Sequence, residues 1–306
     1  MKILAVDDEP HILELLTMMA ARAGFTDVST ALSGEIALGM LNTGDAVFDC
    51  LLLDISMPGM DGIELCNLAR RLPGYSKTPI IMLTAMTDKD YIDSAFSVGA
   101  TDYANKPFDI VELHSRLQMA EELVAGRQTA ISGKTKTNGS HSDDIHSQDL
   151  DLSEEIEIEA IKNFIKYNAL GNYLTQLSSS GIAGSQVLAI KIDQIEAIFA
   201  RASSEEFIYV LTEAAEAISV VFSNEGYMMA YAGNGTFMVV STKAPLETSV
   251  GLEIEIQNLL DQRNIEYDSG DSVDIDISIG DPLRASTSKT QCIRKTFDRA
   301  IARAEK

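Results

Sequence analysis

Three aspartates stand directly after short apolar runs, where their carboxylates could hold a metal ion. Asp7 and Asp8 follow the run at residues 3–6, and Asp54 follows the run at 50–53. Carboxylate oxygens are hard ligands that suit Mg²⁺, which also retains bound water. Three such groups placed side by side would repel one another without a cation. These residues therefore indicate one functional site, provided that the fold brings them together.

A hydroxyl group and an ammonium group end two further segments. Thr84 closes the apolar run at 80–83, and Lys106 follows a short segment at 102–104. Apolar strands that alternate with helices predict a parallel sheet covered on both faces. In an open α/β sheet, functional groups gather at the carboxyl ends of the strands. We therefore expect these two side chains beside the three aspartates, along one edge of the sheet.

Helical patterns between these runs complete the alternation. The first begins at Pro10, a favourable first residue of a helix, and ends at Gly24. Apolar residues recur within it at helical spacing. Further patterns follow the later strands. The predicted helices cover residues 10–23, 63–72, 90–98 and about 109–124.

The composition changes sharply after this first part of the chain. Residues 126–152 are dominated by Gly, Ser, Thr, Asn, Gln, His and Asp, with few apolar residues. Such a segment buries too little apolar surface to offset the entropy of ordering, so we expect a flexible linker. A length of 306 residues with 45% hydrophobic residues suits two domains. We place these domains at 1–125 and 153–306.

The second domain mixes helices and strands. Gly233, Asn234 and Gly235 separate two apolar runs, and Asn-Gly in that place is a strong hairpin signal. Residues 273–279 alternate strictly, which predicts a half-buried strand, and we interpret its two aspartates as a solvent-facing pair. The other predicted elements are strands at 187–193, 227–232 and 237–241, and helices at 152–177, 205–222, 250–263 and from about 290 to the end.

The chain is strongly acidic, which disfavours several functions. Its 24 basic and 46 acidic residues give a formal net charge of −22. A phosphate backbone would be repelled, and no basic helix-turn-helix is recognisable, so we expect no nucleic-acid partner. Three cysteines without CxxC spacing argue against a disulfide framework or a zinc site. Without a signal peptide or a run of about 20 apolar residues, we expect a cytoplasmic protein with no membrane insertion.

Residues 1–125 resemble the receiver domain of two-component response regulators over their whole length. The matching pieces are the Asp7-Asp8 pair, the segment 53–62 (Leu-Asp-Ile-Ser-Met-Pro-Gly-Met-Asp-Gly), Thr84 with Ala85, and the segment 99–108 (Gly-Ala-Thr-Asp-Tyr-Ala-Asn-Lys-Pro-Phe). The resemblance implies a flavodoxin-like fold with a five-stranded parallel sheet. It also implies that Asp54 is the phosphoacceptor, receiving a phosphoryl group in the presence of Mg²⁺.

The resemblance assigns the metal ligands residue by residue. Asp8 and Asp54 would bind Mg²⁺ directly, Asp7 through water, and Ser56 through its backbone carbonyl. Phosphoryl transfer needs little covalent help from the protein beyond charge neutralisation and positioning. This acidic, oxygen-rich set of ligands matches that requirement.

Two more site residues and a switch residue are implied in the same way. Lys106 would supply a point charge to a phosphoryl oxygen. Thr84 would hydrogen-bond another oxygen once its loop moves, and Tyr103 would swing inward with it. The new dianion on Asp54 would thus bias a two-state switch.

Residues from about 153 to 306 resemble, more weakly, the GGDEF domain of diguanylate cyclases. The resemblance rests on four short segments, and it implies a second α/β domain with a mostly antiparallel sheet. These segments are 188–193 (Leu-Ala-Ile-Lys-Ile-Asp), 233–237 (Gly-Asn-Gly-Thr-Phe), 278–280 (Ser-Ile-Gly) and 300–304 (Ala-Ile-Ala-Arg-Ala).

The active residues of that family do not carry over. The metal-binding aspartate of the first strand falls on Lys191, and the acidic third residue of the signature falls on Gly235, followed by Thr236. The guanine-reading positions fall on Phe199 and Ile208. The inhibitory product site would fall on residues 224–227, Asn-Glu-Gly-Tyr, which lack its arginine–aspartate pair. Two-metal chemistry requires both bridging carboxylates, so we lean against an enzyme.

Two functions follow from these resemblances. We favour a response regulator of a phosphorelay whose output is a protein–protein interaction of a catalytically inactive GGDEF-like domain. The alternative is a diguanylate cyclase, activated by phosphorylation, that makes cyclic di-GMP from GTP. The expected partners are a histidine kinase or histidine phosphotransfer protein, an unidentified downstream protein, and a second copy of the chain.

Overall fold

The chain divides into two compact units, Met1–Asp143 and Asp144–Lys306, and each is described by itself. The division falls within the predicted linker at 126–152. The predicted ends of the domains stay a prediction, because residues 135–149 lie outside the part that the structure describes. The computed structural model describes residues 1–43, 47–85, 89–134, 150–153, 156, 158, 161–179, 185–223, 226–242, 248–284 and 290–305, without the side chains of 127–134, 178–179 and 290–292.

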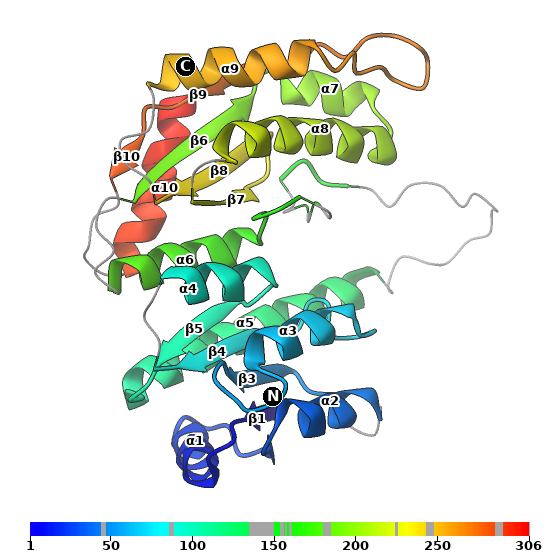
Figure 1. Cartoon of the computed structure of the whole chain (residues 1–306). Coiled ribbons are helices and arrows are strands. Elements are labelled where there is room, and N and C mark those ends of the chain that lie inside the picture. The colour runs from blue at the N-terminus through cyan, green and yellow to red at the C-terminus, as the bar shows by residue number, and fades with distance from the viewer. Residues whose placement is uncertain are drawn as a thin grey trace, which may run out of the picture. The chain divides into compact units, whose positions relative to one another are not determined.

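The first unit contains a five-stranded parallel sheet of flavodoxin-like type (Figure 1). The strand order is β2-β1-β3-β4-β5, and all four neighbouring pairs are parallel. Strands β1, β3 and β4 are buried over their whole length, because helices cover both faces of the sheet. The strands are β1 (Ile3–Val6), β2 (Val28–Ala31), β3 (Cys50–Asp54), β4 (Ile80–Thr84) and β5 (Asp102–Asn105).

Two layers of helices enclose this sheet. Helices α1 and α5 pack on one face, where Leu16 and Leu117 meet Ala5 and Leu52 in one apolar cluster. Helices α2, α3 and α4 lie next to one another on the other face. The helices of this unit are α1 (Pro10–Arg22), α2 (Gly34–Asn42), α3 (Gly62–Arg71), α4 (Lys89–Ser97) and α5 (Ile110–Lys134).

Two differences from the sequence prediction concern this unit. Strand β2 and helix α2 had no predicted counterpart in the residue pattern, since β2 is a short edge strand with Ser29 and Thr30 at its centre. Helix α5 continues to Lys134, so the predicted end of this helix at residue 124 is wrong, and the helix includes the first residues of the segment at 126–152. Among the described residues, no helix is both long and apolar enough to cross a bilayer.

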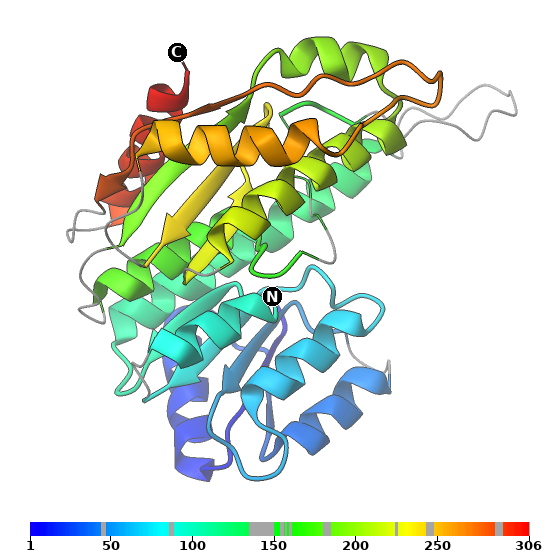
Figure 2. The same cartoon turned by 45° about the horizontal axis from the view of Figure 1, so that its top comes forward.

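The second unit is built on an antiparallel sheet. Its order is β10-β6-β8-β7, with β9 also paired to β6. Helices α7, α8 and α9 pack on one face, and α6 and α10 lie on the other (Figures 1 and 2). The elements are α6 (Tyr167–Ser179), β6 (Gln186–Ile192), α7 (Ile195–Arg201), α8 (Ser204–Phe222), β7 (Tyr227–Tyr231), β8 (Thr236–Ser241), α9 (Ser249–Asp261), β9 (Ile277–Ile279), β10 (Leu283–Arg284) and α10 (Thr290–Ala304).

The predicted helix at 152–177 is wrong in its first half. Helix α6 begins only at Tyr167, and the described residues before it are not helical. The Leu152 carbonyl accepts the Asn234 N–H at 2.8 Å, and Ile165 N–H donates to the Met229 carbonyl at 2.8 Å. The apolar side chains that suggested a helix pack instead against the core of the unit. Backbone pairing with the edge strand β7 and with the hairpin turn has replaced helical hydrogen bonds.

The predicted strand at 273–279 is shorter than expected, because the ladder includes only Ile277–Ile279. The predicted alternation nevertheless appears in the burial pattern. Val273 and Ile275 are buried, whereas Asp274 and Asp276 are exposed. The segment therefore runs with one face inward, and in its first half the Val273 N–H donates to the Ile265 carbonyl at 2.8 Å instead of joining the ladder with β6.

The contact between the segment at 150–153 and the hairpin can be tested at Gly233. A Cβ on Gly233 would lie 2.7 Å from the Ser153 carbonyl oxygen, and φ at Gly233 is +86°. Gly270 is a matched control, since its φ is +84° but no atom lies within 4 Å of its Cβ position. Gly233→Ala should therefore cost about 1–3 kcal/mol more unfolding free energy than Gly270→Ala, because it adds a clash to the same backbone strain.

The measurement is denaturant unfolding of both variants, together with hydrogen exchange of the Asn234 amide. That amide should exchange faster in Gly233→Ala, since its acceptor at Leu152 is displaced. Equal destabilisation by the two substitutions would contradict this account of the turn.

Candidate functional site

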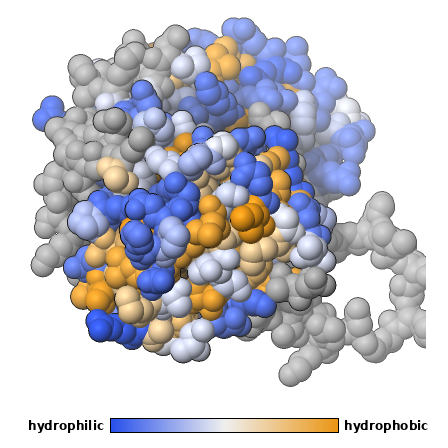
Figure 3. All heavy atoms as spheres, turned by 60° about the horizontal axis from the view of Figure 1, so that its bottom comes forward, coloured by the Kyte–Doolittle hydropathy of each residue, from blue (hydrophilic) through white to orange (hydrophobic). Residues whose placement is uncertain are grey.

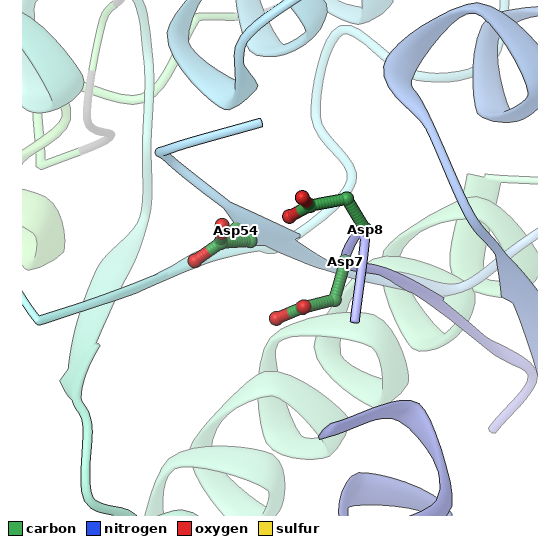
Figure 4. A group of neighbouring side chains, drawn as sticks. All are labelled: Asp7, Asp8 and Asp54. Atoms are coloured by element: carbon green, nitrogen blue, oxygen red, sulfur yellow. The ribbon is translucent and has the colours of Figure 1, made fainter. Parts of the chain in front are cut away.

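Three carboxylates meet at the C-terminal edge of the first sheet (Figure 4). Asp7 and Asp8 follow β1, and Asp54 is the last residue of β3, the neighbouring strand. One oxygen atom of each carboxylate lies within 4.8 Å of the other two. Figure 4 shows the three side chains around a common space. The parallel pairing of β1 with β3 thus produces the cluster that the sequence predicted.

Lys106 connects two of these acids. It follows β5, and its Nζ lies 2.7 Å from Asp7 Oδ2 and 2.7 Å from Asp54 Oδ1. Its backbone N–H donates to the carbonyl of Thr84 at 2.7 Å, and the peptide bond to Pro107 is cis. Charge-assisted contacts of this length are strong hydrogen bonds. One ammonium group therefore neutralises part of the charge of a three-carboxylate cluster.

Burial sets the electrostatics of the cluster. Asp7 is 0% exposed and Asp54 is 3% exposed. Burial raises the pKa of Asp54, and the charges of Asp7 and Asp8 add to this, against the opposing effect of Lys106. Burial by itself would lower the pKa of Lys106, but its bonds to Asp54 and Asp7 outweigh burial and the pKa is raised. Lys106 therefore stays protonated. Its single positive charge does not balance three carboxylates, so a further cation would stabilise the cluster.

The donor set fits Mg²⁺. Oxygen atoms that share one Mg²⁺ at about 2.1 Å lie at most about 4.2 Å apart, on opposite sides of the octahedron. The oxygens of the cluster lie within 4.8 Å of one another, so a small side-chain rotation or one bridging water would complete the geometry. A site with both buried and exposed carboxylates also allows the ion to keep part of its water shell.

The remaining predicted site residues lie at the same edge or near it. Thr84 is the last residue of β4, is 1% exposed, and neighbours β3 in the sheet. Ser56 stands two residues beyond Asp54 and is exposed. Tyr103 lies within β5 and is 0% exposed, so its ring is already buried in this structure. The assigned roles of these three residues stay predictions.

Gly62 fixes the position of β3, and the sequence analysis did not single it out. A Cβ on Gly62 would lie 2.1 Å from the backbone oxygen of Asp54. The Gly62 N–H donates to the Ile55 carbonyl at 3.1 Å, and the Asp61 carboxylate caps α3 by accepting the Glu64 N–H at 2.8 Å. Only a residue without a side chain allows α3 to start this close to β3. The Asp-Gly pair at a helix start was the available signal.

Comparison with known proteins agrees with this geometry. The family model of the response regulator receiver domain matches residues 3–118. The chemotaxis protein CheY of Pseudomonas aeruginosa is 36% identical over 126 residues, which cover 41% of this chain and 100% of that protein. The chain belongs to the response regulator receiver family. Its residues 3–118 therefore form a receiver domain of this family.

Other relatives share the receiver and differ in length. The transcriptional regulatory protein YvrH of Bacillus subtilis is 38% identical over 117 residues, covering 38% of this chain and 47% of that protein. The DNA-binding response regulator MtrA of Mycolicibacterium smegmatis is 38% identical over 117 residues, covering 38% and 49%. The chain thus spans about half the length of these curated relatives. The solved structure of CheY4 from Vibrio cholerae is 36% identical, with a TM-score of 0.37 over 39% of this chain and 97% of that one.

A groove on the receiver lies apart from the carboxylates. It has a volume of about 550 Å³ and lies between α1 and β2, where Leu13, Met18 and Leu32 contribute apolar lining. Figure 3 brings this end of the receiver forward and shows apolar surface next to hydrophilic surface. Asp7, Asp8 and Asp54 are not among the residues that line the groove, so the groove is not part of the carboxylate cluster.

The structure also places the residues singled out in the second unit. Lys191 pairs with Thr236 across β6 and β8, and its Nζ lies 3.4 Å from Glu305 Oε1. Phe199 packs edge-on against Phe207 in the core, and Ile208 is 38% exposed. The predicted stretch at 224–227 is described only from residue 226 onward, because residues 224 and 225 lie outside the described part.

Gly62 provides a test of the packing behind the site. Gly62→Ala should lower the unfolding free energy by about 2–4 kcal/mol and displace Asp54, because the new methyl group overlaps the backbone of β3. Gly39→Ala in α2 is the control, since nothing lies within 4 Å of its Cβ position. That variant should gain about 0.5–1 kcal/mol from helix propensity. Thermal unfolding and Mg²⁺ titration of both variants check this, and a neutral Gly62→Ala would refute the close-packing argument.

Proposed function

We propose that the chain is a phosphorelay response regulator whose Asp54 accepts a phosphoryl group with Mg²⁺, and whose second unit acts through protein–protein interaction as a catalytically inactive GGDEF-like domain. The observation that carries the proposal is the buried cluster of Asp7, Asp8 and Asp54 with Lys106 bonded to two of its members. Each residue type matches a requirement of phosphoryl transfer, and the family of the receiver is established.

The reaction needs one new bond and one broken bond. A carboxylate oxygen of Asp54 bonds to phosphorus, while the phosphorus–nitrogen bond of the donor's phosphohistidine breaks. The electron pair stays on the donor imidazole, which takes up a proton from solvent. A bound Mg²⁺, held by Asp8, Asp54 and the Ser56 carbonyl, with Asp7 through water, would supply positive charge next to the phosphoryl oxygens. Lys106 would exchange a carboxylate partner for a phosphoryl oxygen.

The response to phosphorylation would use Thr84 and Tyr103. Thr84 ends β4, one residue beyond Leu83, which pairs with Asp54. A rearrangement of the loop after β4 would bring its hydroxyl to a phosphoryl oxygen. Tyr103 lies on the strand beyond it, opposite Met82. Movement of the first would alter the packing of the second, and the surface formed by β5 and α5 would change. Such a change would alter affinity for a second copy of the chain or for a downstream protein.

Three contacts support an inactive second unit. The position of one expected metal ligand holds Lys191, which already faces Glu305. The position of the other holds Gly235, where a Cβ would lie 2.8 Å from the side chain of Ile195. The Gly235 N–H also donates to the Tyr231 hydroxyl at 3.0 Å. A carboxylate side chain in place of Gly235 would therefore require the turn to move. A metal cation at this site would also be repelled by the ammonium group of Lys191.

Phosphorylation should depend on one residue. With acetyl phosphate or a phosphorylated histidine donor and Mg²⁺, the chain should gain one phosphoryl group, and Asp54→Asn should gain none. EDTA should also abolish it, because the carboxylate cluster then lacks its counter-charge. Asp27→Asn is a matched control, since Asp27 is an exposed acid before β2, at the other end of the sheet. Intact-mass spectrometry measures the product, and label persisting in Asp54→Asn would overturn the assignment.

The alternative, a phosphorylation-activated diguanylate cyclase, makes the opposite prediction for GTP. Incubation of the phosphorylated and the unphosphorylated chain with GTP and Mg²⁺ or Mn²⁺ should yield no cyclic di-GMP, because Lys191 and Gly235 replace both metal ligands. Chromatography against a no-enzyme control is the measurement. Product above that control, and more of it after phosphorylation, would favour the cyclase instead.

A further inference from the structure

The first turn of α2 holds the loop that follows the phosphoacceptor strand. Glu35 Oε1 accepts the backbone N–H of Met60 at 2.9 Å. The same oxygen lies 2.6 Å from where a Cβ on Gly59 would stand, and Gly59 has φ of +77°. On the other side, a Cβ on Gly34 would lie 2.7 Å from the Met60 carbonyl oxygen. Loop and helix therefore touch closely at two successive residues of each.

This loop carries the backbone carbonyl that is expected to bind the metal. Its base is held where Ile55 N–H donates to the Leu83 carbonyl at 2.9 Å and Gly62 N–H donates to the Ile55 carbonyl at 3.1 Å. Its tip is held at Met60 by Glu35. Ser56 lies between these two attachments. Fixing both limits the rotation of the peptide whose carbonyl Ser56 contributes.

We propose that Glu35 is a positioning residue for the Mg²⁺ site, acting through the Met60 N–H to hold the loop that presents the Ser56 carbonyl. The inference rests on the proposed function, since it requires that Ser56 ligates the ion. Groups that orient the ligands of a metal commonly alter its affinity without touching it. Glu35 stands outside the motif segments that identify the receiver, and in the sequence it resembles an ordinary acidic residue of a first helical turn.

A long-range charge effect is the rival explanation for any influence of Glu35. Hydrogen bonds from backbone amides, first its own and then that of Met60, lower the pKa of Glu35, so its carboxylate is ionised at neutral pH. Its charge would attract a cation even without the hydrogen bond, although water and salt weaken this attraction at an exposed position. Glutamine separates the two effects, because its side-chain oxygen can accept the same bond without the charge.

The experiment is a calorimetric Mg²⁺ titration of the unphosphorylated full-length chain and three variants. Glu35→Ala should raise the Mg²⁺ dissociation constant about 3- to 10-fold, the usual worth of one net hydrogen bond. Glu35→Gln should stay within about 2-fold of the unsubstituted chain by the same reasoning. Glu121→Ala, which removes an exposed acid of α5, controls for net charge. Hydrogen exchange of the Met60 amide should quicken in Glu35→Ala and change little in Glu35→Gln.

The outcomes distinguish this inference from the function on which it rests. If the unsubstituted chain binds no Mg²⁺, the metal assignment and this inference both fall. If it binds Mg²⁺ and Glu35→Ala binds equally well, this inference alone is overturned. It is also overturned if the Ala and Gln variants weaken binding equally, because charge would then be the cause.

Discussion

The mutual repulsion of buried carboxylates is the constraint on which the receiver depends. Asp7 and Asp54 are almost completely buried, and Asp8 adds its charge at the rim of the cluster. Their positions raise the pKa of Asp54, and a single ammonium group cannot balance three acids. A cluster with three carboxylates and one ammonium group attracts cations. It would accept a negatively charged phosphoryl group only if a cation balanced the added charge. The placement of the acids therefore supports the proposed metal dependence.

The sheet supplies the rigidity that such a placement requires. Each acid follows or ends a central strand that is buried along its whole length, so the backbone that carries the carboxylates cannot shift without disturbing the core. The glycine at the start of α3 brings that helix against the backbone of Asp54, and Glu35 attaches the intervening loop to α2. Packing therefore fixes the acids, while the lysine, at the end of a flexible stem, can exchange partners. The division between fixed acids and an adaptable cation suits the proposed transfer of a phosphoryl group.

Much of this site could be predicted from the sequence because its signals are local. An apolar run followed by a polar or charged residue identifies the end of a strand. Because parallel strands align their carboxyl ends at one edge of the sheet, the sequence predicts that Asp7, Asp54 and Lys106 lie close together. The roles of Glu35 and Gly62 could not be predicted in this way. They come from contacts between separate elements, and such contacts leave no periodic pattern in the sequence. The helix expected at 152–177 failed for a related reason: its apolar spacing suited a helix, but pairing with an exposed strand edge offered its backbone another partner.

The second unit differs from the receiver in the charge of two positions, Lys191 and Gly235. At the two positions where the GGDEF resemblance would place metal ligands, this unit has a lysine and a tightly packed glycine. The Lys191–Glu305 contact is partly exposed and contributes little to stability, so its meaning is not structural reinforcement. On the proposed function, these two positions bind neither metal nor nucleotide, and the unit acts through its outer surface.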